Sequence, residues 1–395
     1  MRIALLTQYY KPEIGAPQNR LYEMISGLRE LGNEVIVVTG MPNYPTGKIF
    51  ESYKGKFSHT EDIDGITTRR YWLYASNTKS KLPRIWNMLS FSATSLFSYR
   101  FLKNHKIDCL IVESPPLTLG LTGYILSRMT GAKLVANISD LWPLSARELG
   151  AISDGVVYNI LEKVEHFIYR KSQFCMGQSA EIVDYIASHG AKDTYLFRNG
   201  VDPTRFSHNC ESRESDGSFK IVYAGLLGFA QGVYDICRNV DFKSLGCEFH
   251  IYGAGGEQSD IESYLKETGD KGIYYHGKVC REEIPNILGK SDATLVPLVK
   301  NIFGAVPSKI YESMAAGLPI LFSGEGEGER IIKEYDLGWC SKAKDFNSMM
   351  HNIIEMKSNP VLVAKKRANC LACSQNKFNR PRQISALNDY LQSKI

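Results

Sequence analysis

The chain has 395 residues, of which 44% are hydrophobic and 23% are charged, and its formal net charge is +5. This length exceeds what one hydrophobic core usually organises, so we expect two domains. No run of Lys or Arg resembles a nucleic-acid-binding tail, and no stretch reaches the roughly 18 apolar residues of a membrane-spanning helix. The N-terminus also lacks a signal-peptide pattern. We therefore expect a cytoplasmic protein with no nucleic-acid partner and at most a peripheral membrane contact.

The nine cysteines are odd in number and scattered, which favours a reducing compartment over a disulfide framework. Cys370 and Cys373 form a single C-x-x-C, but no second Cys or His pair accompanies them. We therefore favour two cysteines one helical turn apart over a metal site.

Strands and helices alternate from the N-terminus onward. Six short apolar runs in the first half predict buried strands at 3–7, 34–40, 109–114, 133–139, 174–179 and 195–200. Leu21, Ile25, Leu28 and Leu31 fall on one face of a predicted helix that Gly32 ends. Apolar strands that alternate with helices favour a parallel sheet covered on both faces.

Asp62 and Asp64 form a D-x-D triplet, a pattern that can hold a divalent metal ion. Gly65 and a strand-like run follow, and Asp-Gly between two such runs is a hairpin signal. We therefore favour a turn and expect no metal site.

The segment Lys81–Lys106 differs from its surroundings, because apolar side chains lie between basic ones. The apolar residues are Trp86, Leu89, Leu96, Phe97 and Phe101, and the basic ones are Lys81, Arg84, Arg100, Lys103 and Lys106. A helix lying in a membrane interface has this composition, and so does a buried helix with basic ends.

The strand pattern restarts in the second half, at 219–225, 247–253, 273–277, 293–298 and 318–323. The polar stretch His208–Ser218 reads as a linker or long loop. We therefore expect α/β domains at 1–205 and 206–375, with a C-terminal helix at about 376–395 that packs back on the first domain. Ligands of such sheets bind beyond the carboxyl ends of the strands, so a cleft between the domains is the expected site.

Glycine-rich turns follow several of the predicted strands. Gly225–Gly232 and Lys11–Pro17 each precede a helix, where backbone N–H groups can meet a phosphate or a sugar. The turn Gly253–Gly256 lacks the full dinucleotide spacing, so we interpret it as a tight strand-to-helix turn.

The stretch Val306–Phe322 predicts a short helix that starts after Pro307, with Ser308 as its N-cap, and ends at Gly317. Lys309 then lies in the first turn, the unfavourable end for a cation, which makes sense if an anion binds there. Glu312 lies on the same side and can accept hydrogen bonds from a ribose diol. The alternative is an ordinary surface ion pair between the two.

The sequence SKIYESMAAGLPI within this stretch resembles the donor-site signature of family 4 glycosyltransferases, which have the GT-B fold. The resemblance extends over nearly the whole chain, through 5–40, MPNYPTGKIF, DLWP and NGVD. The last three recur in bacterial members that build surface polysaccharides such as capsule or O-antigen, fucosamine transferases among them. The fold that this implies is a pair of doubly wound Rossmann-like domains facing across a cleft.

The resemblance implies retaining transfer of a hexosyl or N-acetylhexosaminyl group from a nucleotide diphosphate sugar, expected to be UDP-linked, without metal or cofactor. The implied acceptor is a polyprenyl diphosphate-linked glycan at the inner face of the plasma membrane, with 81–106 as the membrane contact. The implied catalytic residues are Lys309, Glu312 and Asp140. The implied donor-binding residues are Gly15, Arg20, Gly225, Gly228, Gln231, His276, Gly277, Pro307 and Ser308.

The chain departs from the family pattern at two places. Family members often carry a second glutamate eight positions before Glu312, where this chain has Gly304. They also often carry Arg and Lys in the loop where this chain offers Leu227, Gly228 and Gln231. Two alternatives therefore stay open: a sugar-nucleotide epimerase or hydrolase, and a non-catalytic protein that binds nucleotide sugars.

Overall fold

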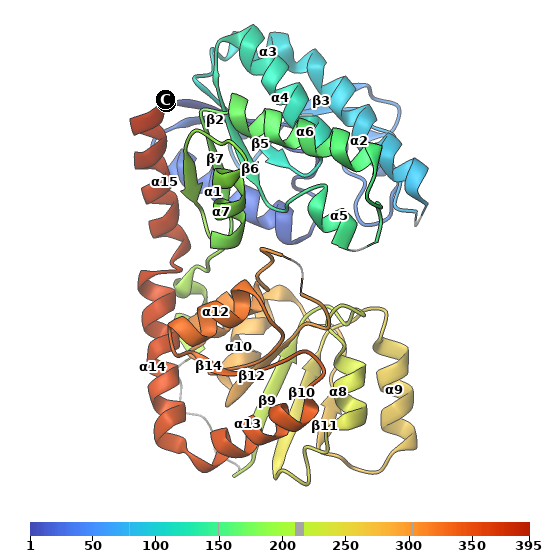
Figure 1. The fold of residues 1–395 in the computed structure, drawn as a ribbon, viewed down its shortest axis with the longest axis vertical. Helices are drawn as coiled ribbons and strands as arrows, with labels where there is room; N and C mark the ends of the chain where they lie inside the picture. The colour runs from blue at the N-terminus through green and yellow to red at the C-terminus, as the bar shows by residue number, and fades with distance from the viewer. Residues whose placement is uncertain (79, 149, 210–216, 302) are drawn as a thin grey trace. The chain divides into compact units, whose positions relative to one another are not determined.

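The computed structural model describes residues 1–78, 80–148, 150–209, 217–301 and 303–395. The chain divides into two compact units (Figure 1). Unit 1 comprises Met1–Arg198 and Pro381–Ile395, and unit 2 comprises Asn199–Arg380. Of the linker expected from the sequence, residues 210–216 lie outside the described residues.

Unit 1 is built on an eight-stranded sheet in the order β3-β4-β2-β1-β5-β6-β7-β8. All neighbouring strands are parallel except β3 and β4. Each strand run expected in the first half overlaps one of these strands. They are β1 (Arg2–Leu6), β2 (Glu34–Gly40), β3 (Ser58–Ile63), β4 (Ile66–Tyr71), β5 (Cys109–Ser114), β6 (Lys133–Ile138), β7 (Phe174–Gly177) and β8 (Thr194–Leu196).

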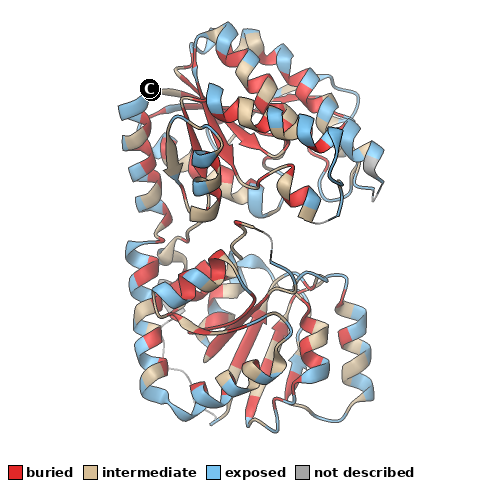
Figure 2. Ribbon diagram, viewed as in Figure 1, coloured by how far each residue is buried: buried red, intermediate tan, exposed pale blue. Residues whose placement is uncertain are grey.

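Helices cover both faces of the unit 1 sheet (Figure 1). Along β1, Ile3 and Leu5 belong to a buried cluster on one face, and Ala4 and Leu6 belong to a cluster on the other. Both clusters appear as the red interior of Figure 2. The helices are α1 (Ala16–Glu30), η1 (Glu51–Tyr53), α2 (Lys81–Thr94), η2 (Ser95–Ser98), α3 (Tyr99–Asn104), α4 (Leu117–Thr130), α5 (Leu144–Glu148), α6 (Val156–Lys171), α7 (Ala180–Ser188) and α15 (Arg380–Lys394).

Helix α1 buries Leu21, Ile25 and Leu28, as its apolar period predicts, and the chain turns at Gly32 with φ +87°. The placement of Leu31 on the same buried face is wrong. The helix ends at Glu30, so Leu31 lies beyond it and is 44% exposed.

The C-terminal helix α15 packs against α1 within unit 1. Its side chains Ile384, Leu387 and Leu391 are buried in the same cluster as the apolar face of α1. A buried hydrogen bond from Asn33 to Asn388, 2.7 Å long, also joins α15 to this unit. The C-terminal helix α15 therefore belongs to the same hydrophobic core as α1.

The D-x-D triplet forms the predicted hairpin turn between β3 and β4. Ile63 pairs with Ile66, and Asp64 and Gly65 both have positive φ, as a tight hairpin requires. Asp62 accepts a 2.7 Å hydrogen bond from the Gly65 N–H, and Asp64 pairs with Lys11 at 3.2 Å. Both carboxylates are therefore used by the turn and its neighbours.

Unit 2 is built on a six-stranded, wholly parallel sheet in the order β11-β10-β9-β12-β13-β14. Buried clusters again lie on both faces. Every strand run expected in the second half contains a strand, and β14 was not anticipated. The strands are β9 (Phe219–Ala224), β10 (Cys247–Tyr252), β11 (Ile273–Tyr275), β12 (Ala293–Pro297), β13 (Ile320–Ser323) and β14 (Gly338–Ser341).

Helices flank the unit 2 sheet, and one of them contains the C-x-x-C sequence. The helices are η3 (Pro203–Asn209), α8 (Val233–Asn239), α9 (Gln258–Glu267), η4 (Arg281–Glu283), α10 (Ile284–Gly289), α11 (Lys309–Ala315), α12 (Glu327–Glu334), α13 (Phe346–Ser358) and α14 (Pro360–Asn376). Cys370 and Cys373 lie one turn apart on α14, buried, and the Cys370 thiol donates to the Leu318 carbonyl. The prediction that these cysteines lie one helical turn apart is confirmed.

The segment 81–106 lies on the outside of unit 1 and is not a buried helix. On α2, Leu82 is 70% exposed and Trp86 61%, and Phe97 of η2 is 67% exposed. The opposite side of the segment is buried through Phe91 and Leu102. Among the described residues, no helix has both the length and the apolar character needed to cross a bilayer.

The buried carboxyl of Glu165 on α6 gives unit 1 a pH-dependent stability. Burial raises the pKa of Glu165 from 4.5 to about 7, although the Tyr169 hydroxyl donates to it at 2.6 Å. The folded chain therefore keeps a proton that the unfolded chain loses at lower pH. This contribution is fully present below the unfolded pKa and is lost as the pH rises through about 7.

We expect Glu165→Gln to mimic the protonated carboxyl. Its stability should match the wild type near pH 5 and exceed it at pH 8 by roughly 2 kcal/mol. Denaturant unfolding of both proteins across this range measures the difference. Glu30→Gln, exposed on α1, is the control and should show no such trend. A pH-independent difference for Glu165→Gln would contradict the assignment.

Candidate functional site

At the carboxyl ends of the central strands of unit 2, the loops that follow the strands lie in close contact. Strand β9 lies between β10 and β12, so the chain changes direction across the sheet at β9, where ligands of such sheets bind. The loops after β9, β10 and β11 are joined by backbone hydrogen bonds from Gly225 to Tyr252 and from Gly253 to Gly277, 2.8 and 2.7 Å long.

Gly225 and Gly253 are required here by sterics. Their φ angles are +151° and +149°, in a region that side chains rarely adopt. A Cβ on Gly253 would lie 1.8 Å from the Gly225 carbonyl oxygen. A side chain at Gly253 would therefore push the two strand ends apart.

Lys309, the first residue of α11, extends its side chain over Gly225. A Cβ on Gly225 would lie 2.3 Å from Lys309 Cε and 2.6 Å from Nζ, so the absence of a side chain makes room for the ammonium group. The ammonium lies 5.1 Å from the centre of the Tyr223 ring. Among the described residues, no hydrogen bond or ion pair within 4 Å reaches Lys309 Nζ. Burial lowers the pKa of Lys309, and the charge of Glu312 opposes this.

Helix α11 begins after Ser308, which is its N-cap as predicted, but among the described residues the Ser308 side chain does not make the usual capping hydrogen bond. No hydrogen bond to the Ser308 hydroxyl caps the helix within the described part of the chain, and its carbonyl oxygen accepts from the Tyr311 and Glu312 N–H groups. The Pro307 carbonyl accepts from Ile310 at 3.1 Å. The Ser308 side chain is exposed.

The loop after β9 carries Gly228 and Gln231 in a turn closed by a 2.9 Å hydrogen bond between their backbones. The Gln231 Oε1 atom is buried and has no hydrogen-bond partner among the described residues. An unsatisfied buried acceptor is costly, so this atom is a position where a donor group from a ligand or a water would be stabilised.

Glu257, which sequence reasoning missed, is the N-cap residue of α9 (Gln258–Glu267), and its carboxylate lies at the start of α8. Its carboxylate accepts hydrogen bonds from the N–H groups of Val233 and Tyr234, at 2.9 and 3.3 Å. Burial raises the pKa of Glu257, and these two hydrogen bonds oppose the shift. The α8 terminus is therefore occupied by the chain's own carboxylate. A lone Glu after a glycine turn gave no signal of this role, because its partners lie 24 and 23 residues away.

His276 and Gly277 follow β11 at the same edge. The His276 ring stacks on Tyr252 at 4.3 Å and meets His250 at 3.0 Å between ring nitrogens. Burial lowers the pKa of His276. Its N–H donates to the Ile251 carbonyl, and Gly277 adopts φ +76°. Main-chain atoms here are held firmly at the sheet edge.

Gly304, which replaces the expected first glutamate, has φ +76°. That conformation is strained for any residue with a side chain. The loop at this position therefore favours glycine over a glutamate.

In unit 1, Arg20 is engaged by its own domain. Its guanidinium forms a buried ion pair with Glu113 at 2.5 Å and also donates to Gln178 and Ser139. Burial raises the pKa of Glu113, and Arg20 is the largest opposing influence. The positive charge of Arg20 is thus balanced within the protein.

The other two residues selected in unit 1 lie at the carboxyl ends of strands. Gly15 is the N-cap of α1 in an extended conformation, beside the buried and partnerless Gln18 Oε1 atom. Asp140 follows β6, where burial raises its pKa and the Ser145 hydroxyl opposes the shift.

Two domain families match this chain. Residues 15–200 match the glycosyl transferase 4-like domain, and residues 217–359 match the glycosyl transferases group 1 domain. The putative colanic acid biosynthesis glycosyl transferase WcaI of Escherichia coli K12 is 23% identical over 350 residues, which is 83% of this chain and 84% of WcaI. An Escherichia coli enzyme named UDP-Gal:α-D-GlcNAc-diphosphoundecaprenol α-1,3-galactosyltransferase is 26% identical over 74% of this chain and 76% of its own length.

Among solved structures, Anabaena HepE in complex with UDP aligns with a TM-score of 0.72, 14% identity and full coverage of both chains. This likeness establishes the fold.

The Arg20–Glu113 pair yields a stability prediction. Arg20→Met should lower the free energy of unfolding of unit 1 by about 3 kcal/mol, because it leaves Glu113 buried without its cation. Adding Glu113→Gln should recover at least half of the loss. Arg29→Met, on the exposed end of the same helix, is the control and should cost less than about 1 kcal/mol. Denaturant unfolding measures all four proteins, and an undiminished stability of Arg20→Met would contradict the interpretation.

With two parallel α/β units and both domain matches in order along the chain, this protein is a glycosyltransferase with the GT-B fold, composed of a glycosyl transferase 4-like domain and a glycosyl transferases group 1 domain.

Proposed function

We propose that the enzyme transfers a sugar from a nucleotide diphosphate sugar, with UDP as the nucleotide, to a lipid-linked glycan in bacterial surface polysaccharide synthesis. The observation that carries the donor part is the placement of Lys309 over Gly225. A partly buried cation without an ion-pair partner among the described residues is a position where a diphosphate would be strongly bound.

Three comparisons support the finer parts of the proposal. The name of WcaI refers to colanic acid biosynthesis, which suggests surface polysaccharide as the product class. The name of the galactosyltransferase includes a UDP-sugar and a diphosphoundecaprenol-linked acceptor. HepE was solved with UDP bound. The fucosamine-transferase subgroup and the type of hexosyl group stay predictions.

The proposed mechanism is electrostatic. As the sugar–phosphate bond breaks, negative charge grows on the departing diphosphate, and the ammonium of Lys309 stabilises it where water is scarce. Glu312, one turn further along α11, binds the ribose hydroxyls. The glycines at 225 and 253 keep the backbone close to the donor, because no side chain stands between.

Retention at the anomeric carbon and independence of metal are further parts of the proposal, taken from the family resemblance. Proton NMR of the first-formed product reports its anomeric configuration, and a chelator in the assay reports the role of metal. An inverted product, or activity lost with chelator and restored by a divalent cation, would overturn the respective part.

The donor site is tested by Lys309→Ala and Glu312→Ala. Each should weaken UDP binding, measured by calorimetry, by about tenfold or more, because each removes a charged contact. Lys266→Ala, on exposed α9, is the control and should leave binding unchanged. Near-native affinity and turnover in both site variants would place the donor elsewhere.

The nucleotide is tested by thermal stabilisation with UDP- and GDP-sugars. A ligand at a hundredfold excess over its dissociation constant stabilises the fold by about 2.7 kcal/mol, so the true donor should raise the melting temperature most. We expect UDP-sugars to do so. Incubation with the donor alone then separates the alternatives: release or isomerisation of the sugar without acceptor would indicate the hydrolase or epimerase, and binding without turnover would indicate a non-catalytic protein.

The exposed apolar side of α2 supports a membrane contact near a lipid-linked acceptor. Leu82, Ile85, Trp86 and Leu89 recur at helical spacing and are all at least 40% exposed. Apolar side chains of a helix lying in a bilayer interface follow this pattern.

We expect Leu82→Ser/Trp86→Ser to reduce the partition of the protein into anionic vesicles by at least about tenfold, because it removes the most exposed apolar area. The matched control is Ile354→Ser/Val361→Ser, which removes exposed apolar side chains from unit 2. Vesicle sedimentation measures both. Equal partition of the two variants would contradict the membrane contact.

A further inference from the structure

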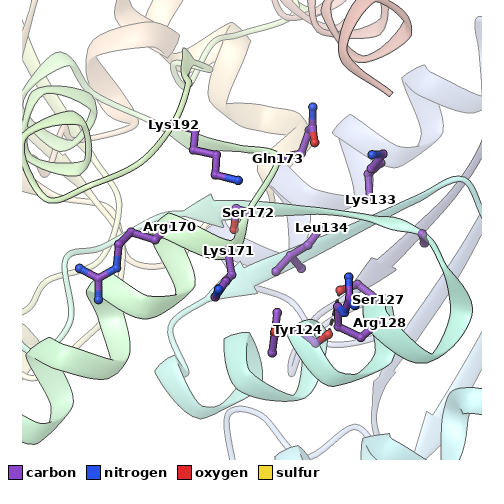
Figure 3. A pocket seen from close by; sticks show the side chains of 11 residues that line it. Tyr124, Ser127, Arg128, Lys133, Leu134, Arg170, Lys171, Ser172, Gln173 and Lys192 are labelled. Atoms are coloured by element: carbon purple, nitrogen blue, oxygen red, sulfur yellow. Dashed lines mark hydrogen bonds between the residues drawn. The ribbon is translucent and has the colours of Figure 1, made fainter.

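A basic cavity lies in unit 1 at the amino ends of its strands. It has a volume of about 520 Å³. Ala132, Lys133 and Leu134 line it at the start of β6, and Ser172 and Gln173 line it just before β7 (Figure 3). The carboxyl ends of these strands, where Asp140 and Gln178 lie, are at the opposite edge of the sheet. This cavity is therefore separate from the strand ends discussed above.

Five cationic side chains line the cavity and no acidic ones do. They are Arg128, Lys133, Arg170, Lys171 and Lys192. They come from four separate segments: the end of α4, the start of β6, the end of α6 and the loop before β8 (Figure 3). Segments far apart in the sequence thus place positive charges around one cavity.

The charges of these side chains are not neutralised locally. Among the described residues, none of the five forms an ion pair within 4 Å. Two acidic residues beside the lining are already engaged. Asp193, which follows Lys192, pairs with Lys394 at 2.7 Å, and Asp108, whose carbonyl accepts from the Lys133 N–H, pairs with Arg2 at 2.9 Å. The rest of the lining is uncharged, with the Ser172 hydroxyl donating to the Ile168 carbonyl.

Helix ends explain part of this pattern. Arg128, Arg170 and Lys171 occupy the last turns of α4 and α6, where cations commonly offset the helix dipole. That explanation does not extend to Lys133, which opens a strand, or to Lys192, which lies in a loop. It also does not explain why both helix ends face one cavity. A volume of this size is typical of small-molecule sites.

We propose that this cavity is a second anion-binding site, which takes a ligand with several phosphate charges. Lysine and arginine side chains surrounding a hollow bind phosphate oxygens through charge-assisted hydrogen bonds. The ligand is either a free phosphate compound or the phosphate headgroup of a lipid, and both share this chemistry. The proposal does not depend on the donor assignment.

The test uses the full chain with inorganic tripolyphosphate as the probe. Because this probe can also enter a donor site, all proteins carry Lys309→Ala. The test variant adds Lys133→Gln, Lys171→Gln and Lys192→Gln. The control adds Lys48→Gln, Lys163→Gln and Lys266→Gln, three exposed lysines outside the cavity. Both sets remove the same charge from exposed positions.

Calorimetry at low salt should show binding that is at least about tenfold weaker in the test variant and within about twofold of the parent in the control. Equal affinity in the two triple variants would overturn the proposal. Backbone amide shifts of 127–134 and 170–173 in the parent protein provide a measurement that needs no cavity variant. Unchanged shifts at saturating probe would also overturn it.

The source of the phosphate is tested with vesicles of phosphatidylglycerol or phosphatidylcholine. If the cavity variant binds both tripolyphosphate and phosphatidylglycerol vesicles more weakly than the control, a lipid headgroup is the ligand. If tripolyphosphate binds and vesicle binding is unaffected by the cavity variant, a free phosphate compound is the ligand.

Discussion

The donor half of the account depends on the close approach of two backbone segments that carry no side chains. Where β9 and β10 end, Gly225 and Gly253 come so near that a single Cβ would collide with a carbonyl oxygen at 1.8 Å. The space kept open by Gly225 is filled by the aliphatic end of Lys309. One steric constraint therefore fixes both the shape of the sheet edge and the position of its cation.

The buried cation selected in unit 1 has an ion-pair partner, whereas the one selected in unit 2 has none among the described residues. In unit 1 the guanidinium of Arg20 is balanced by Glu113 and fixed by Ser139, so its role is to hold strand ends together. In unit 2 burial lowers the pKa of Lys309, while the first amides of α8 are taken by Glu257. A diphosphate would restore the charge balance at Lys309, and for this reason we propose the unit 2 edge as the binding site of an anionic donor.

Much of the fold could be predicted from the sequence, because each buried strand is a continuous apolar run and each glycine turn is local. The Asp64–Gly65 hairpin and the start of α11 follow from such local signals. The partners of Arg20 and Glu257 could not be predicted, because they depend on pairings across 93 and 24 residues. The short β14 and the exposed Leu31 were missed for a related reason: edge strands and helix ends are decided by tertiary packing. The basic cavity has no local signature at all, since its charges come from four segments.

The most direct measurement of the central claim is the pKa of the Lys309 ammonium, followed by NMR with and without UDP. In the free protein this pKa should lie below the ordinary value of 10.5, because burial disfavours the charge. On saturation with UDP it should rise, since the diphosphate stabilises the ammonium. A pKa that stays the same when UDP is bound would show that Lys309 does not meet the diphosphate, and would contradict the account.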